Sequence, residues 1–116
     1  MHRSTMIDWD VYEWEQVREG VKRKVVHAGG CTIVLNLIFP NHQPMPHAHR
    51  QEQIAYLISG QAEFYVGQEV FKIKSGDMLV IPANETHHIK VIGESDCINL
   101  DIFVPKRDDY TESSLK

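Results

Sequence analysis

The stretch PHAHRQEQIAYLISG (residues 46–60) places two histidines one residue apart, shortly before an apolar segment that ends at a glycine. The segment is short and contains isoleucine and tyrosine, which favours a β-strand, and the glycine indicates a tight turn after it. Side chains two residues apart on a strand share one face, so His47 and His49 point the same way. Two imidazoles beside an apolar strand face are uncommon unless something binds them, so the pair indicates a binding site.

Segments of the same kind recur along the chain and predict an all-β fold. They lie at residues 24–28, 31–39, 53–59, 61–66, 69–73, 77–81, 86–92 and 97–104. Residues 40–46 hold three prolines, which excludes a central strand there. About eight antiparallel strands in about 100 residues are typical of a sandwich or a jelly-roll barrel. We expect one domain over residues 1–116, with the barrel at roughly 20–105 and a helical turn near Tyr12–Val17.

Composition and charge exclude several classes of partner. The chain is 42% hydrophobic and 24% charged, with a formal net charge of −4. Because no basic stripe stands out, we expect no nucleic-acid partner, and we interpret Lys22–Lys24 as the solvated side of a strand. No apolar run has the length of a membrane span, and the first residues lack an apolar signal core, so we expect a cytoplasmic protein without membrane contact. Cys31 and Cys97 are expected to be small buried thiols rather than a disulfide.

The alternation of side chains along each strand predicts which residues face inward. If Gln53 faces inward, Ala55 and Leu57 join it, and His87 is joined by Ile89 and Val91 while His88 faces outward. On the last segment one face is mixed, with Cys97, Asn99, Asp101 and Phe103. The opposite face is wholly aliphatic, with Ile98, Leu100, Ile102 and Val104. Such a face needs a cover, either another layer of strands or a second subunit, and we expect a homodimer.

The inward histidines can hold a first-row metal ion, which needs neutral imidazoles within about 2.1 Å of one point. His47 and His49 lie on one face, and Gln53 and His87 have the correct facing to complete the site. Glu52 is next to Gln53, but alternation turns it outward. The alternative is that the histidines are solvated residues of a polar loop.

The spacing of these residues resembles a known pattern. His47-x-His49-x3-Gln53-x6-Gly60 is followed, after fifteen residues, by Gly76-x5-Pro82-x4-His87, and the two motifs resemble the two signatures of the cupin superfamily. The resemblance implies a jelly-roll barrel, or double-stranded β-helix, that binds one divalent transition metal ion (Ni, Zn, Mn, Fe or Co). Most cupins carry glutamate where this chain has Gln53. A neutral three-histidine, one-glutamine site leaves the metal its full charge, which favours Lewis-acid chemistry on an anionic substrate.

Three longer stretches resemble the KdgF-type pectin-degradation cupins. They are EGVKRKVV (19–26), RQEQIAYLISG (50–60) and LDIFVPKRDDY (100–110), and the resemblance covers roughly 14–110. It implies conversion of 4,5-unsaturated monouronates, the products of pectin and alginate lyases, to linear 4-deoxy-5-keto uronates. The family's metal ligands fall on His47, His49, Gln53 and His87, and its catalytic aspartate and phenylalanine fall on Asp101 and Phe103.

Each remaining role has an alternative. We expect Asp101 to transfer a proton and Phe103 to exclude water, but either residue could be purely structural. Arg107 could bind the substrate carboxylate in bidentate fashion or pair with the neighbouring Asp108 or Asp109. Two other functions also fit a cupin of this size. One is a small-molecule dioxygenase, and the other is a protein that binds or senses a sugar or metal without turnover.

Overall fold

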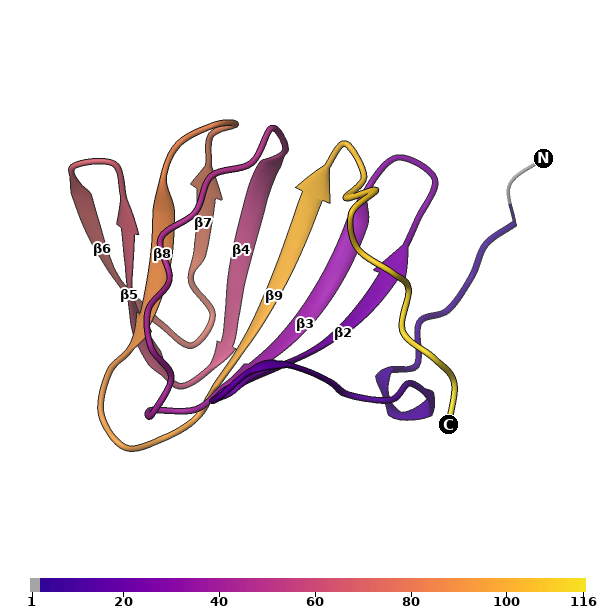
Figure 1. Cartoon of the computed structure of the whole chain (residues 1–116), viewed down its shortest axis with the longest axis horizontal. Helices are drawn as coiled ribbons and strands as arrows, with labels where there is room; N and C mark the ends of the chain where they lie inside the picture. Colours follow the sequence, from indigo (N-terminus) through magenta and orange to yellow (C-terminus); the bar gives the residue numbers. More distant parts are fainter. Residues whose placement is uncertain (1–2) are drawn as a thin grey trace.

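The computed structural model describes residues 3–116, and strands dominate it. A single 3-10 turn, η1 (Trp9–Val11), precedes β1 (Glu15–Arg18), β2 (Val21–His27), β3 (Thr32–Ile38), β4 (Glu52–Ser59), β5 (Gln61–Val66), β6 (Glu69–Lys74), β7 (Met78–Ile81), β8 (His87–Val91) and β9 (Cys97–Val104). They form a six-stranded sheet in the order β1-β2-β3-β9-β4-β7 and a three-stranded sheet in the order β6-β5-β8 (Figure 1). All the pairings are antiparallel, which confirms the predicted all-β class.

The region before β2 differs from the sequence prediction. The expected helical turn near Tyr12–Val17 is absent, and residues from Glu15 onward instead pair as an edge strand with β2, with Glu15 opposite Arg23. A short 3-10 turn lies earlier, where the Asp8 carboxylate accepts a hydrogen bond from the Asp10 amide. Pairing with β2 satisfies backbone groups that one isolated helical turn would leave open.

The cationic cluster Lys22–Lys24 is also more buried than predicted. Lys24 is only 4% exposed, its ammonium group donates to the Trp9 carbonyl at 2.6 Å, and it lies 4.5 Å from the Trp14 ring centroid. The N-terminal segment therefore covers Lys24, and a charged residue here anchors that segment instead of facing solvent.

The predicted facing of the strands is confirmed. On β9 burial alternates, with Cys97, Asn99, Asp101 and Phe103 all buried. The main apolar cluster joins both sheets and includes Ala55, Leu57, Ala62, Phe64, Ile73, Val91 and Cys97. It fills one part of the space between the sheets, so the polar inward residues Asn99 and Asp101 lie beside a hydrophobic core.

Two further sequence expectations concern the cysteines and the membrane. Both cysteines are free thiols, Cys97 fully buried and Cys31 half-buried. Within residues 3–116 we find no helix with the length and hydropathy to cross a bilayer.

Candidate metal centre

Three imidazoles meet where the loop between β3 and β4 runs beside the start of β8. The backbones of His47 and His87 exchange two hydrogen bonds, at 3.0 and 2.9 Å, and the Asn84 amide donates to the His49 carbonyl at 2.7 Å. These bonds hold two segments about forty residues apart in one place. The ring of His87 lies 4.4 Å from that of His47 and 4.8 Å from that of His49, measured between centroids.

Backbone contacts also determine which ring nitrogen carries the proton. In each histidine Nδ1 lies close to a carbonyl oxygen two residues away, and a carbonyl can only accept, so Nδ1 carries the hydrogen. Each Nε2 is then left with a free lone pair, which is the form that binds metals. The ligating nitrogens lie within 4.8 Å of one another, and the buried Nε2 of His87 has no hydrogen-bond partner. For His47, His49 and His87 in turn, the accepting carbonyls belong to Met45 (2.9 Å), Gln51 (3.0 Å) and Glu85 (2.8 Å).

Gln53 adds an oxygen to this cluster. Its Oε1 lies 3.1 Å from Nε2 of His49, and its amide group donates to Oδ1 of Asp101 at 2.8 Å. With Nδ1 of His49 protonated, Oε1 and Nε2 both present lone pairs, as two ligands of one cation would. Two ligands about 2.1 Å from one metal ion and at right angles to each other are about 3.0 Å apart. The three histidines and Gln53 therefore fit a divalent transition metal ion.

The electrostatic setting keeps His49 and His87 neutral. Burial and, to a smaller extent, the charges of His47, His49 and Arg107 together lower the pKa of His87 to about 4. Burial also lowers the pKa of His49, with the charge of Arg107 acting in the same direction. Both rings are therefore unprotonated at neutral pH and available as ligands.

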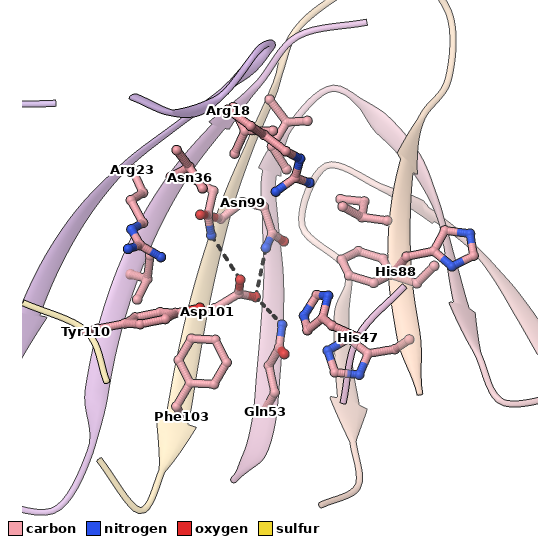
Figure 2. Close-up of a pocket in the computed structure, with 17 residues that line it drawn as sticks. Arg18, Arg23, Asn36, His47, Gln53, His88, Asn99, Asp101, Phe103 and Tyr110 are labelled. Carbon is pink, nitrogen blue, oxygen red and sulfur yellow. Dashed lines mark hydrogen bonds between the residues drawn. The ribbon is translucent and has the colours of Figure 1, made fainter. Parts of the chain in front are cut away.

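Asp101 lies behind Gln53, away from the histidines (Figure 2). Its Oδ1 accepts from Gln53 and from Asn99, each at 2.8 Å, and its Oδ2 accepts from Asn36 at 2.9 Å. These three amide donors favour the ionised carboxylate, but the side chain is almost wholly buried. The desolvation outweighs the donors and raises the pKa of Asp101 to about 6.

A cavity of about 120 Å³ connects these groups. Of the predicted site residues, His47, Gln53, His87, Asp101 and Phe103 line it, and His49 adjoins it through Gln53. His49 and Phe103 pack edge to face, with 5.2 Å between their ring centroids.

Arg107 is the one predicted site residue outside this group. Its guanidinium donates to the Asp109 carboxylate at 3.0 and 2.8 Å and lies over the rings of Phe103 and Tyr110. It borders a separate surface hollow with His49 and Gln51, whereas the Phe103 ring beneath it lines the cavity.

Sequence reasoning did not assign roles to Asn36, Asn99 or Arg18, all of which line the cavity. Asn36 had a detectable signal, because it is the one amide in an otherwise aliphatic strand segment, and its register partner on β9 is Asn99. Arg18 carried no such signal.

Residues 37–103 match the family model Cupin_2, described as a cupin domain. The chain belongs to the cupin family. This cupin is 30% identical over 103 residues to "Pectin degradation protein KdgF" of Dickeya dadantii (strain 3937), an alignment that covers 87% of this chain and 93% of the relative. The match confirms the resemblance to the KdgF proteins.

Solved structures agree with this assignment. KdgF from Halomonas sp. superposes with a TM-score of 0.83 at 25% identity, covering 92% of this cupin and 98% of that chain. An RmlC-like cupin from Shewanella frigidimarina NCIMB 400 has a TM-score of 0.84 at 22% identity, with coverage of 94% and 97%. The second likeness concerns the fold alone, and it confirms the predicted jelly-roll architecture.

The geometry places His87, and not its neighbour His88, in the imidazole cluster. The ring of His88 stacks on Tyr65, with centroids 4.6 Å apart, and is not one of the clustered imidazoles. We expect His87→Ala to lower metal affinity by more than about 10–100-fold, since loss of a group that merely supports a ligand already costs that much. His88→Ala should keep its metal. Metal content per chain, measured by mass spectrometry after dialysis, tests this, and equal loss in both variants would contradict it.

Proposed function

We propose that this cupin is a metal-dependent enzyme that converts 4,5-unsaturated monouronates to linear 4-deoxy-5-keto uronates in pectin or alginate degradation. The observation that carries the proposal is the buried Asp101, whose pKa is about 6 and which is joined through Gln53 to a cluster of metal ligands. The similarity to a relative named for pectin degradation supports the same conclusion.

The proposed reaction is an isomerisation that balances without an oxidant or a second substrate. The ring form is a hemiacetal whose ring oxygen belongs to an enol ether conjugated with the carboxylate. A base removes the proton of the anomeric hydroxyl, the bond between C1 and the ring oxygen breaks, and C1 becomes an aldehyde. The electron pair of the broken bond stays on the ring oxygen as an enolate at C5. Protonation at C4 then gives the 5-keto product.

A bound divalent metal ion would supply Lewis-acid stabilisation of negative charge on a substrate oxygen. His47, His49, His87 and Gln53 would hold it. All four ligands are neutral, so the site would keep the full positive charge of the cation. An anionic sugar acid benefits from that charge, whereas a dioxygenase would usually have an anionic fourth ligand.

Asp101 is suited to move the proton. With a pKa of about 6 it is mostly ionised at neutral pH, so it can accept the hydroxyl proton, and its acid form is strong enough to return a proton to C4. The donors that hold it are amide groups of Gln53, Asn36 and Asn99, which do not compete as bases. Phe103, only 3% exposed, closes the wall beside it and limits access of water.

The outer face of the six-stranded sheet supports the proposal that the enzyme is a homodimer. Ile98, Leu100 and Ile102 lie on this face, and Leu100 pairs in register with Leu35 on one side and Tyr56 on the other. Nearby, Val80 and Met78 are 58% and 62% exposed. Such a contiguous apolar surface is unusual on a monomer, and a second copy of the same sheet is a cover of matching chemistry.

The proposed activity predicts a direct optical result. Metal-loaded protein, incubated with monouronates released by a pectin or an alginate lyase, should remove the ultraviolet absorbance of the conjugated double bond faster than the spontaneous reaction. Protein stripped of metal by a chelator should not. No acceleration with several unsaturated uronates would contradict the proposal and favour the binding or oxidative alternatives.

Asp101→Asn should lower turnover by about 10²–10⁴-fold, which is the usual contribution of a general acid–base group. The ionisation near pH 6 should also disappear from the pH profile of kcat. Because the new amide cannot accept all three donors, metal occupancy is measured in the same preparation. A variant that holds its metal and still works near the wild-type rate would assign proton transfer to another residue.

Leu100→Lys should convert the protein to a monomer, because it places a charge at the centre of the proposed contact. Val70→Lys is the control, since Val70 is 52% exposed on an edge strand of the other sheet. Mass measured by light scattering should be near twice 13.4 kDa for the wild type and the control. A wild-type mass of one chain at micromolar concentration would contradict the dimer.

A further inference from the structure

We infer that Arg18 binds the carboxylate of the substrate and so determines which way the sugar lies in the cavity. The identity of the ligand rests on the proposed function, whereas the anion-binding role rests on the structure around Arg18. Arg18 lines the same cavity as Asp101 and the histidines, and Figure 2 shows its guanidinium near Asn99.

β1 is irregular at Arg18, which lines the cavity. The register between β1 and β2 shifts between Gln16 and Arg18, as in a β-bulge. The shift interrupts the strict alternation of side chains at this point, and Arg18 lines the cavity. The Gln16 side chain donates to the Arg18 carbonyl at 2.6 Å and supports this local geometry.

The turn that follows Arg18 is equally constrained. Gly20 has φ of +79°, and a Cβ atom there would lie 2.8 Å from Cα of His42. A larger residue would therefore force the turn away from its neighbour. The turn two residues after Arg18 is therefore held close against His42.

The charge of Arg18 has no partner within residues 3–116. Arg23, Arg50 and Arg107 each pair with a carboxylate, whereas no acidic group lies within ion-pair distance of Arg18. Its Nε is buried without a hydrogen-bond partner, and burial lowers its pKa. A partly desolvated guanidinium without an anion is costly, so a ligand anion would be strongly favoured there.

No carboxylate of residues 3–116 that lines the cavity is free to pair with the Arg18 guanidinium, so a ligand anion can do so. Asp101 is the one carboxylate lining the cavity among the described residues, and its oxygens already accept from three amides. Asn99 Oδ1 is buried without a partner, so it can accept from a ligand hydroxyl. Arg23 also lines the cavity, but it pairs with Glu15 at 2.7 Å and lies over the Tyr110 ring.

This arrangement predicts an orientation for the sugar. On β9 the inward positions run from Phe103, opposite Gln53, through Asp101 to Asn99, and such positions repeat about every 6.6 Å. A carboxylate at Arg18 places C4 and C5 near Asn99 and the anomeric hydroxyl toward Gln53 and the histidines. Asp101 then lies between C1, which carries the anomeric hydroxyl, and C4. One carboxylate can therefore take the hydroxyl proton and deliver a proton to C4.

The inference is tested by removing the charge of the substrate carboxylate and, separately, the charge of Arg18. In the wild type, kcat/KM for the unsaturated uronate should exceed that for its methyl ester by about 10- to 100-fold, as expected for a hydrogen bond to a charged group. Arg18→Gln should reduce this preference to near one, mainly by weakening the acid, and Arg18→Lys should restore part of it. Arg3→Gln, an exposed arginine away from the cavity, should behave as the wild type. An Arg18→Gln variant with the full preference for the acid would overturn the inference.

Binding without turnover separates this inference from the proposed reaction. Metal-loaded wild type should bind D-galacturonate more tightly than D-galactose in calorimetry, and Arg18→Gln should lose that preference while keeping its melting temperature. This outcome supports Arg18 even if no unsaturated uronate is turned over. A preference that survives in Arg18→Gln, or no measurable binding of galacturonate by the wild type, would overturn the role of Arg18.

Discussion

The buried hydrogen bond from Gln53 to Asp101 links the two halves of the site. Its length is 2.8 Å, and it fixes which end of the Gln53 amide faces His49. An acidic residue at position 53, common in cupins, would place two carboxylates together in a space with little water. One of them would have to bind a proton, because like charges at that distance raise the pKa of the pair. Gln53 and Asp101 are therefore a matched pair, in which the neutral amide allows the neighbouring acid to ionise.

Keeping Asp101 inside the barrel depends on this environment. A buried carboxylate without partners is strongly unfavourable, and three amide donors, from β3, β4 and β9, offset much of that cost. The offset is incomplete, which is why the pKa of Asp101 is raised to about 6. The sheet order makes this possible, since β9 lies between β3 and β4 and the donors approach from both sides. The polar network therefore follows directly from the strand topology.

Much of this arrangement could be predicted from the sequence, because side-chain alternation on regular strands is reliable when one face is buried. That rule correctly placed Asp101 and Phe103 inward and Glu52 outward. The motif spacing correctly predicted that the three histidines cluster and that Gln53 contacts one of them, His49. Arg18 could not be found this way, since its segment was predicted as a helical turn and the strand found there has a register shift at Arg18. The burial of Lys24 was missed because its cover, Trp9 and Trp14, comes from outside the regular strands.

The hydrogen bonds from the three Nδ1 atoms to backbone carbonyls have a consequence for how such a site can evolve. Because the carbonyls of residues 45, 51 and 85 orient the rings, the orientation does not depend on which side chains those residues carry. Substitutions in the surrounding loops can change the shape and charge of the cavity entrance while the imidazole rings keep their orientation. The same set of ligands could then serve different substrates in related proteins, with selectivity changing by loop replacement and the metal chemistry inherited intact.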